Sequence, residues 1–262
     1  MTASPKRWRW TTLAAPARFD ALARRAVPLC WLVAGLTGLA GLWVSFMLAP
    51  TDFQQGQSYR ILFIHVPAAW MSMILYLAIA FWSALGWGLN ARMATTLARA
   101  IAPTGALFTA IALWTGALWG QPTWGTWWVW DARLTSELIL LLLYLGYIAL
   151  VESIDEPRRA ARAGAVLSLV GALNVPIIYF SVRWWNTLHQ GASISLSAAP
   201  KMAQTMLLAL GLMTLACWAW AFAVILTRAR ALNLRAEAET RWVAAQYGEP
   251  IAATPPFHES KS

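Results

Sequence analysis

Charged residues are scarce in this sequence. Asp, Glu, Lys and Arg together account for 12% of its 262 residues, whereas hydrophobic residues account for 59%. This balance excludes an ordinary soluble domain and is typical of a protein that crosses a membrane several times. Acidic residues are the rarer kind, with 11 against 20 basic residues and a net charge of +9. The excess does not indicate a nucleic-acid partner, because loop charge and attraction to anionic lipid account for it.

Cysteine and histidine are also rare. The two cysteines, Cys30 and Cys217, both lie in hydrophobic runs and form no CxxC motif. We therefore expect small buried apolar side chains and no thiol chemistry by this chain alone. The three histidines are His65, His189 and His258, and their rarity makes their positions informative.

Six hydrophobic runs are each long enough to cross the roughly 30 Å hydrocarbon core of a bilayer. Because lipid offers no hydrogen bonds, each span must satisfy its backbone polar groups internally, and we expect six helices. Asn174 and Pro176 predict a kink in the fifth run. The sequence thus predicts an all-α integral membrane protein with a transmembrane domain at residues 27–227. The six runs cover residues 27–48, 61–89, 100–120, 136–151, 164–182 and 203–227.

Residues 1–26 form a predicted N-terminal arm, and residues 228–262 form a predicted C-terminal tail. The stretch 14–27 carries Arg18, Asp20 and Arg24, so it lacks the apolar core of a signal peptide. Aromatic residues alternate with arginines in the arm, which favours an amphipathic segment at the membrane interface. The tail is charged and then rich in Pro, Ala and Glu, and we expect a short helix followed by disorder.

The distribution of Lys and Arg predicts the orientation in the membrane. The two termini and the loops at 90–99 and 152–163 hold 16 of these residues, whereas the other three loops hold 4. Loops rich in Lys and Arg stay on the cytoplasmic side. We therefore expect both termini in the cytoplasm and the three poor loops outside.

The second outer loop contains the sequence WGTWWVWDARLTSEL, residues 124–138, in which four of the first seven residues are tryptophan. Tryptophans are common at membrane interfaces, but they are normally spread along the interface. Trp124, Trp127 and Trp128 have the spacing of one helical face, and Asp131 continues it. This concentration predicts a surface that receives a flat ligand.

The residues around this cluster predict where the neighbouring helices end. Pro122 is expected to end the preceding span, and Gly125 leaves room for a close approach. Thr135 or Ser136 can cap the next helix, with Glu137 favourably placed at its positive end. The cluster is thus predicted to be a short aromatic surface between two helix ends.

Two of the histidines belong to the same predicted outer face. His65 lies near the outer end of the second run and His189 lies in the third outer loop, both beside aromatic residues. A single histidine at the membrane border is usually a satisfied polar residue, but two on one face are candidates for function. If residues 184–189 are helical, Trp185 and His189 share a face. His258 lies in the predicted cytoplasmic tail, and we expect no role for it.

Haem is a flat molecule whose iron also binds two nitrogen ligands. Its iron accepts two axial imidazoles, and its faces stack on indole rings. Its anionic propionates pair well with arginine, and the outer loops carry Arg60, Arg133 and Arg183. Zinc and copper are the metal alternatives, although two histidines without a third ligand suit zinc poorly. Quinone is the organic alternative, but it does not need two histidines.

The segment WGTWWVWDARLT matches, position for position, the signature WGxxWxWDxRLT of the haem-handling WWD proteins. With RILFIHVPAAW, the loop WWNTLHQG and six spans, the chain resembles the CcmC family of bacterial cytochrome c maturation over about residues 27–227. The resemblance implies a bacterial inner-membrane protein that binds haem b at the periplasmic face, with His65 and His189 as axial iron ligands. It also implies that the outer WWD segment, residues 119–135, receives the porphyrin. Besides the histidines, the candidate haem-binding residues are Arg60, Trp119, Trp124, Trp127, Trp128, Trp130, Asp131, Arg133, Trp184 and Trp185.

The resemblance implies partners as well. Members of the family hand haem to CcmE, a membrane-anchored periplasmic chaperone. They work with the small protein CcmD and with the ABC-type subunits CcmA and CcmB, whose ATP hydrolysis releases the loaded chaperone. This chain has no nucleotide-binding motif, so the resemblance implies a haem-transfer subunit and not an enzyme, without catalytic residues.

Two alternatives stay open at this point. One is a cytochrome c haem lyase of the WWD type, but those chains have more spans and additional histidines. The other is a channel subunit that moves haem through the bilayer, but the inner side and the middle of the spans lack haem ligands.

Overall fold

The computed structural model describes residues 15–189 and 202–248. Within these ranges the chain is helical and contains no β-strand, only an isolated bridge between Asp52 and Gly56. Six helical segments of this part are long and apolar enough to cross a membrane. The predicted all-α fold with six spans is therefore confirmed. The disorder predicted for the end of the tail lies outside the described residues.

The described part contains eight α-helices and two short helices of other types. In chain order they are α1 (Pro16–Trp43), the π-helix η2 (Val44–Leu48), the 3-10 helix η3 (Ser58–Ile61), α2 (Leu62–Gly88), α3 (Arg92–Trp124), α4 (Ala132–Glu152), α5 (Pro157–Gly171), α6 (Asn174–Trp184), α7 (Gln204–Ala236) and α8 (Arg241–Tyr247). The first span consists of α1 and η2, and the fifth consists of α5 and α6. The short α8 confirms the helix predicted in the tail.

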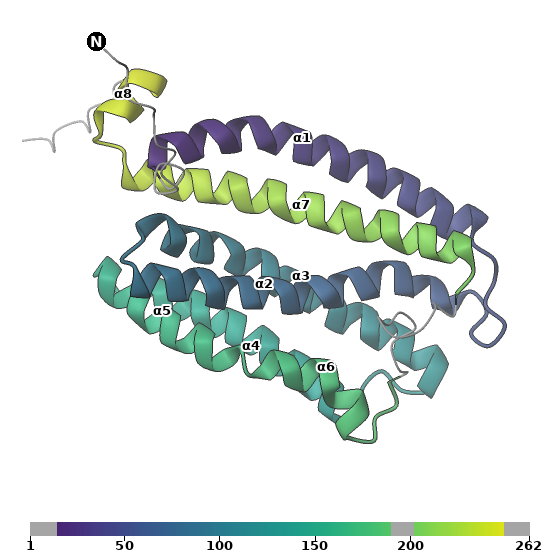
Figure 1. Cartoon of the computed structure of the whole chain (residues 1–262). Coiled ribbons are helices and arrows are strands. Elements are labelled where there is room, and N and C mark those ends of the chain that lie inside the picture. Colours follow the sequence, from purple (N-terminus) through teal and green to yellow (C-terminus); the bar gives the residue numbers. More distant parts are fainter. Residues whose placement is uncertain (1–14, 190–201, 249–262) are drawn as a thin grey trace, which may run out of the picture.

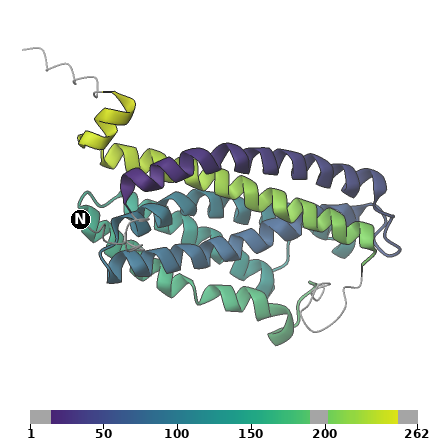
Figure 2. The same ribbon diagram turned by 45° about the horizontal axis from the view of Figure 1, so that its top comes forward.

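The helices pack in three layers (Figure 1, Figure 2). α1 lies along α7, α2 lies along α3, and α4 packs with α5 and α6. The middle layer holds α2. In the apolar 18-residue window of the span that contains α2, 56% of the residues are buried inside the protein, against 11% in that of the first span. Leu32, Leu36 and Leu39 of α1 are exposed, as expected of a helix that faces lipid.

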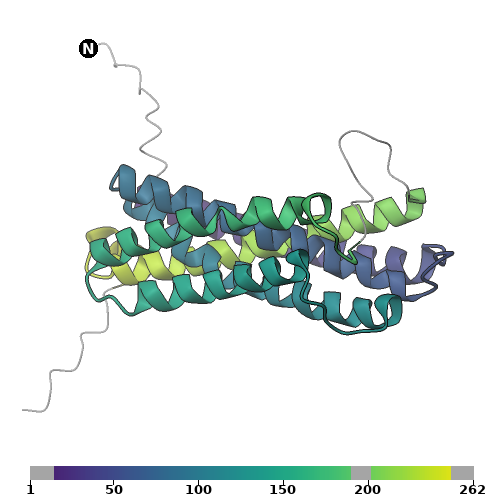
Figure 3. The same cartoon turned by 90° about the horizontal axis from the view of Figure 1, so that it is seen from below.

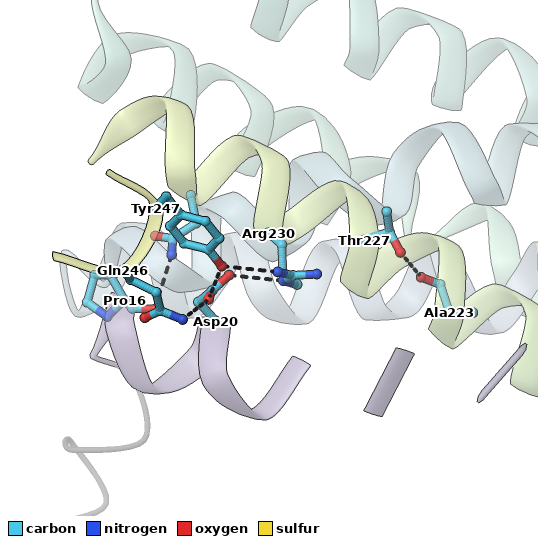
Figure 4. A network of polar contacts seen from close by, with 8 residues as sticks. Pro16, Asp20, Ala223, Thr227, Arg230, Gln246 and Tyr247 are labelled. Atoms are coloured by element: carbon cyan, nitrogen blue, oxygen red, sulfur yellow. Dashed lines mark hydrogen bonds and ion pairs between the residues drawn. The ribbon is translucent and has the colours of Figure 1, made fainter. Parts of the chain in front are cut away.

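α1 begins at Pro16, well before the hydrophobic run at residue 27. Proline suits the first turn of a helix, where its missing N–H removes no hydrogen bond. The part of the predicted arm from Pro16 onward is therefore the start of a long helix, and residues 1–14 of the arm lie outside the described residues. Asp20 of this helix is fully buried because Arg230 of α7 pairs with it at 2.9 Å and the hydroxyl of Tyr247 donates to it at 2.7 Å. This network joins α1, α7 and α8 (Figure 4).

The fifth span is broken at Ala172 and Leu173, between α5 and α6. Asn174 and Pro176 directly follow the break, so the predicted kink is confirmed. The side-chain amide of Asn174 donates to the carbonyl oxygen of Ser136 on α4, 2.9 Å away. Figure 3 shows α5 and α6 following one another along the bundle beside α4. The hydrogen bond fixes the start of α6 against α4.

One end of the bundle carries the segments that are predicted to face outward. The first span ends there, α2 and α4 begin there, and α3 and α6 end there, at the right of Figure 1. We call it the Trp-rich end, because the connection from Gly125 to Asp131 lies there. That this end faces outward stays a prediction from loop charge.

Candidate functional site

A cavity lies at the Trp-rich end between α2, α3, α4 and the segment after α6. It is partly open to the outside and contains about 400 Å³ of empty space, a volume that includes open solvent. Its walls contain both predicted histidines, His65 and His189, together with Trp124 and Arg133. The cavity thus brings together candidate residues from four parts of the chain. Its other lining residues are Ala69, Ala112, Leu113, Gly116, Leu134 and Glu137.

His65 lies near the start of α2 and is buried between α2 and α3, with 8% of its surface exposed. Its Nδ1 lies 3.1 Å from Oγ1 of Thr115 on α3. Its ring packs edge-on against Trp119, with ring centres 5.7 Å apart. A methyl group at Gly116 would lie only 3.1 Å from Cε1 of the ring. Glycine at this position therefore gives the imidazole its space between the helices.

His189 follows the end of α6. Trp185 has an extended backbone, with φ −132° and ψ 156°, and ends this helix. Residues 185–189 are not helical, so the condition under which Trp185 and His189 would share a face is not met. The ring of His189 packs instead against Trp124, with ring centres 5.3 Å apart. Within the described residues, its Nδ1 is buried and has no hydrogen-bond partner.

The rings of His65 and His189 are neighbours, with centres 6.2 Å apart and planes inclined by 46°. Burial, the charge of Arg133 and the nearby ring of His65 lower the pKa of His189 to about 3. The imidazole of His189 is therefore neutral near pH 7. Neutral imidazole has a free lone pair and is the form that binds a metal.

Arg133 lies in the first turn of α4 and reaches α6. Its Nη1 donates a hydrogen bond to the carbonyl oxygen of Ile178, 2.9 Å away. Within the described ranges it forms no ion pair, although Asp131 and Glu137 are close in sequence. A salt bridge from Arg133 that merely holds the loop in place therefore finds no support in this part of the chain. Its guanidinium borders the cavity with donors left over for an anionic ligand.

The connection between α3 and α4 differs from the prediction. α3 continues through Pro122 to Trp124 and ends at Gly125, whose φ of 77° lies in the left-handed region that glycine favours. The connection that follows is not helical. The expected end at Pro122 and the expected helical face of Trp124, Trp127 and Trp128 are therefore wrong.

The start of α4 is also different. Oδ1 of Asp131 accepts a hydrogen bond from the backbone N–H of Leu134 at 2.8 Å and caps the helix. The prediction of a cap at Thr135 or Ser136 is wrong, because α4 starts one turn earlier. Asp131 is thereby given a structural role beside the cavity.

The predicted tryptophans divide by exposure. Trp119 and Trp124 are half-buried, and each contacts one of the two histidines. Trp128 is half-buried and packs edge-on against Trp130, with ring centres 5.4 Å apart. Of the predicted tryptophans, only Trp119 and Trp124 therefore contact a histidine in this structure. The exposed members are Trp127 (57%), Trp130 (76%), Trp184 (56%) and Trp185 (49%).

Arg60 lies outside the cavity lining. Its guanidinium donates to the carbonyl oxygens of Ser45 and of Ala49, the latter at 3.0 Å, and its Nε donates to Gln57. Arg60 thus joins η3 to the end of the first span. Arg183 lies in the last turn of α6 and is exposed, also away from the lining.

Comparison with known proteins identifies the family of the chain. The model of the family "Heme exporter protein C" (CcmC) matches residues 9–244. The chain belongs to the heme exporter protein C family. A relative of that name in Bradyrhizobium diazoefficiens is 52% identical over 208 residues, which cover 78% of this chain and 77% of the relative. Another in Haemophilus influenzae is 43% identical over 247 residues, which cover 91% of this chain and 97% of the relative. A ccmC-like mitochondrial protein of Marchantia polymorpha, named for cytochrome c biosynthesis, is 46% identical over 166 residues, which cover 63% of this chain and 68% of that protein.

In this member of the heme exporter protein C family, sequence analysis missed two site residues: Glu137, which lines the cavity, and Thr115, which contacts His65 from outside the lining. Thr115 contacts His65, and Glu137 is buried with its Oε1 2.7 Å from the hydroxyl of Ser72. Glu137 was expected to stabilise a helix start. An ionisable residue inside a predicted span is itself a signal of function, and it points to Glu137. Thr115 has no such signal, because its contact follows only from the packing of α2 on α3.

Proposed function

We propose that this chain binds haem at the Trp-rich end, with His65 and His189 as the two axial ligands of the iron, and delivers it for cytochrome c maturation. The coarse function, haem handling in cytochrome c maturation, follows from membership of the heme exporter protein C family. The residues that would hold the haem are an inference from the cavity.

The pair of histidines carries the proposal. Two imidazoles on opposite sides of one metal ion have ring centres about 6 Å apart, because each metal–nitrogen bond is about 2 Å long. The observed separation of 6.2 Å between the rings of His65 and His189 fits that arrangement. Among the described residues no group of three His, Cys, Asp or Glu is placed to hold a metal ion. A zinc site, which takes three or four protein ligands, is therefore disfavoured.

The surroundings of the pair suit the rest of a haem molecule. Trp119 and Trp124 supply indole surface beside the histidines. Arg133 supplies a charged fork at the cavity wall, where it would bind a propionate. Asp131 would act indirectly by capping the helix that carries Arg133.

The chain is a multi-pass membrane protein of a haem exporter system. We place it in the bacterial inner membrane, with both termini in the cytoplasm and the Trp-rich end in the periplasm, on the strength of its loop charges. We further propose that it delivers haem to the chaperone CcmE and works beside CcmD and the ABC subunits CcmA and CcmB. In this role it is a transport subunit whose energy comes from another chain.

The absorption spectrum of the purified protein with haem tests the proposal. The native chain should give a low-spin, bis-histidine spectrum. His65→Ala and His189→Ala should each lose it and load less haem onto the chaperone, whereas the tail variant His258→Ala should change neither. An unaltered spectrum in both single variants and in the double variant would overturn the assignment.

A further inference from the structure

The hydroxyl of Thr115 lies between the ring of His65 and the backbone of its own helix. Its Oγ1 is 3.1 Å from Nδ1 of His65, 2.6 Å from the carbonyl oxygen of Ile111 and 3.3 Å from that of Ala112. A hydroxyl has one proton to donate and lone pairs with which to accept. The nearest carbonyl takes that proton, because a carbonyl oxygen only accepts. Thr115 is therefore left with lone pairs toward His65.

The direction of this contact determines which nitrogen of His65 carries a proton. If Thr115 can only accept, Nδ1 of His65 must be the donor. A neutral imidazole has one N–H, so a proton on Nδ1 leaves the lone pair of Nε2 free.

Packing keeps the ring in this orientation. Cε1 of His65 faces Gly116 so closely that a methyl group there would be 3.1 Å away. The imidazole also packs edge-on against Trp119, one turn further along α3. A ring turned by 180° would bring a carbon atom to Thr115 and lose the hydrogen bond. Contacts on α3 therefore select one tautomer and one rotamer together.

We propose that Thr115 is a positioning residue, which holds His65 with its proton on Nδ1 and presents Nε2 to the iron of haem. This inference rests on the proposed function, because it concerns the same histidine. A metal-bound histidine becomes a more basic ligand when its other ring N–H donates a hydrogen bond to an acceptor. Loss of that hydrogen bond typically costs 10–100-fold in metal affinity. A second effect is expected: a more basic His65 stabilises ferric haem and therefore lowers the reduction potential of the haem.

The test compares variants that separate shape from hydrogen bonding. Thr115→Val keeps the shape of the side chain and removes the hydroxyl that accepts the hydrogen bond. Thr115→Ser keeps that hydroxyl. Thr109→Val is the matched control, because Thr109 is also a buried threonine of α3 whose hydroxyl donates one turn back, to Gly105 at 2.8 Å. His65→Ala, measured in parallel, tests the proposed function itself. The readouts are haem dissociation from the purified chain, its absorption spectrum and its reduction potential.

We expect Thr115→Val to keep the low-spin spectrum at saturating haem, to lose haem about 10–100-fold more readily and to have a raised potential. Thr115→Ser and Thr109→Val should behave like the native chain. If Thr115→Val purifies poorly, Thr115→Ala removes the same acceptor. Equal dissociation and potential in Thr115→Val and Thr109→Val, with the spectrum lost in His65→Ala, would refute the role of Thr115 alone. A low-spin spectrum that survives in His65→Ala would refute His65 as an iron ligand and this inference with it, and its survival in His189→Ala and in the double variant as well would refute the proposed function.

Discussion

Arg133 of α4 donates a hydrogen bond to the backbone carbonyl of Ile178 in α6, at 2.9 Å. Asn174, one turn earlier on α6, donates to the backbone of α4 at Ser136. These two contacts hold the second half of the broken fifth span against α4. His189 follows this half-helix, so the fixed position of α6 brings it to the cavity wall that also holds Arg133.

Arg133→Lys tests whether Arg133 recognises a propionate. Lysine keeps the charge but loses the planar fork, including the donor to Ile178. Loss of one charge-assisted hydrogen bond, about 1.5–3 kcal/mol, predicts a fall in haem affinity of about tenfold or more. Haem titration of the purified protein measures it. Arg183→Lys, an exposed arginine outside the cavity, should bind as the native chain does; equal affinity of the two variants would exclude bidentate recognition by Arg133.

Gly116→Ala tests how closely the ring of His65 is held. The added methyl group would lie 3.1 Å from Cε1 and 3.6 Å from Nδ1 of the ring, so the imidazole must move away. We expect weaker haem binding and a low-spin spectrum that is shifted or partly lost. Gly211→Ala on α7 is the control, because no atom lies within 4 Å of its added methyl group. A native spectrum and native affinity in Gly116→Ala would show that this packing does not position the ligand.

Asp20→Asn tests the polar network far from the cavity. Asp20 is fully buried and holds both Arg230 and Tyr247, so loss of its charge should destabilise the chain by about 1–3 kcal/mol and loosen α8. Thermal unfolding in detergent and protease cleavage near residue 240 measure the two effects. Arg92→Gln breaks a pair with Glu237 whose arginine is 59% exposed, and it should cost less than about 1 kcal/mol. If Asp20→Asn is no less stable than Arg92→Gln, the network does not hold the tail.

The spans were predictable because the length of an apolar run in lipid leaves few choices besides a helix. The kink at Asn174 was predictable for a related reason, since Pro176 removes a backbone donor. The ends of the spans were less so. α1 extends back to Pro16 because a buried ion pair keeps Asp20 in the helix, and that pair joins residues far apart in sequence.

The candidate site was predictable in its histidines and not in its geometry. His65 and His189 were identified because ionisable residues are rare in such a chain. The spacing of Trp124, Trp127 and Trp128 suggested a helix, but Gly125 ends α3 with a left-handed residue, and periodicity cannot detect this. The sequence could not identify Thr115 as a site residue, because the hydroxyl of a threonine inside a span usually forms hydrogen bonds only with its own helix.

The arrangement of the tryptophans predicts which of them hold haem and which meet the chaperone. Trp124 lines the cavity and contacts His189, so Trp124→Ala should weaken haem retention about 2–10-fold, which corresponds to 0.5–1.5 kcal/mol for one aromatic contact. Trp127 and Trp130 are 57% and 76% exposed, and we expect their alanine variants to keep haem and to transfer less of it. Trp128→Ala should follow them, because its ring packs on Trp130.

The measurement is haem per purified protein beside haem attached covalently to the chaperone. Trp114→Ala is the control, because Trp114 lies on α3, is 67% exposed and is outside the cavity lining. One haem cannot cover so many outward rings, and an exposed aromatic surface beside a cavity is suited to a partner protein. If the four variants bind and transfer haem as Trp114→Ala does, these tryptophans are an ordinary interfacial belt. If all four lose haem equally, the exposed rings close over the ligand and the chaperone docks elsewhere.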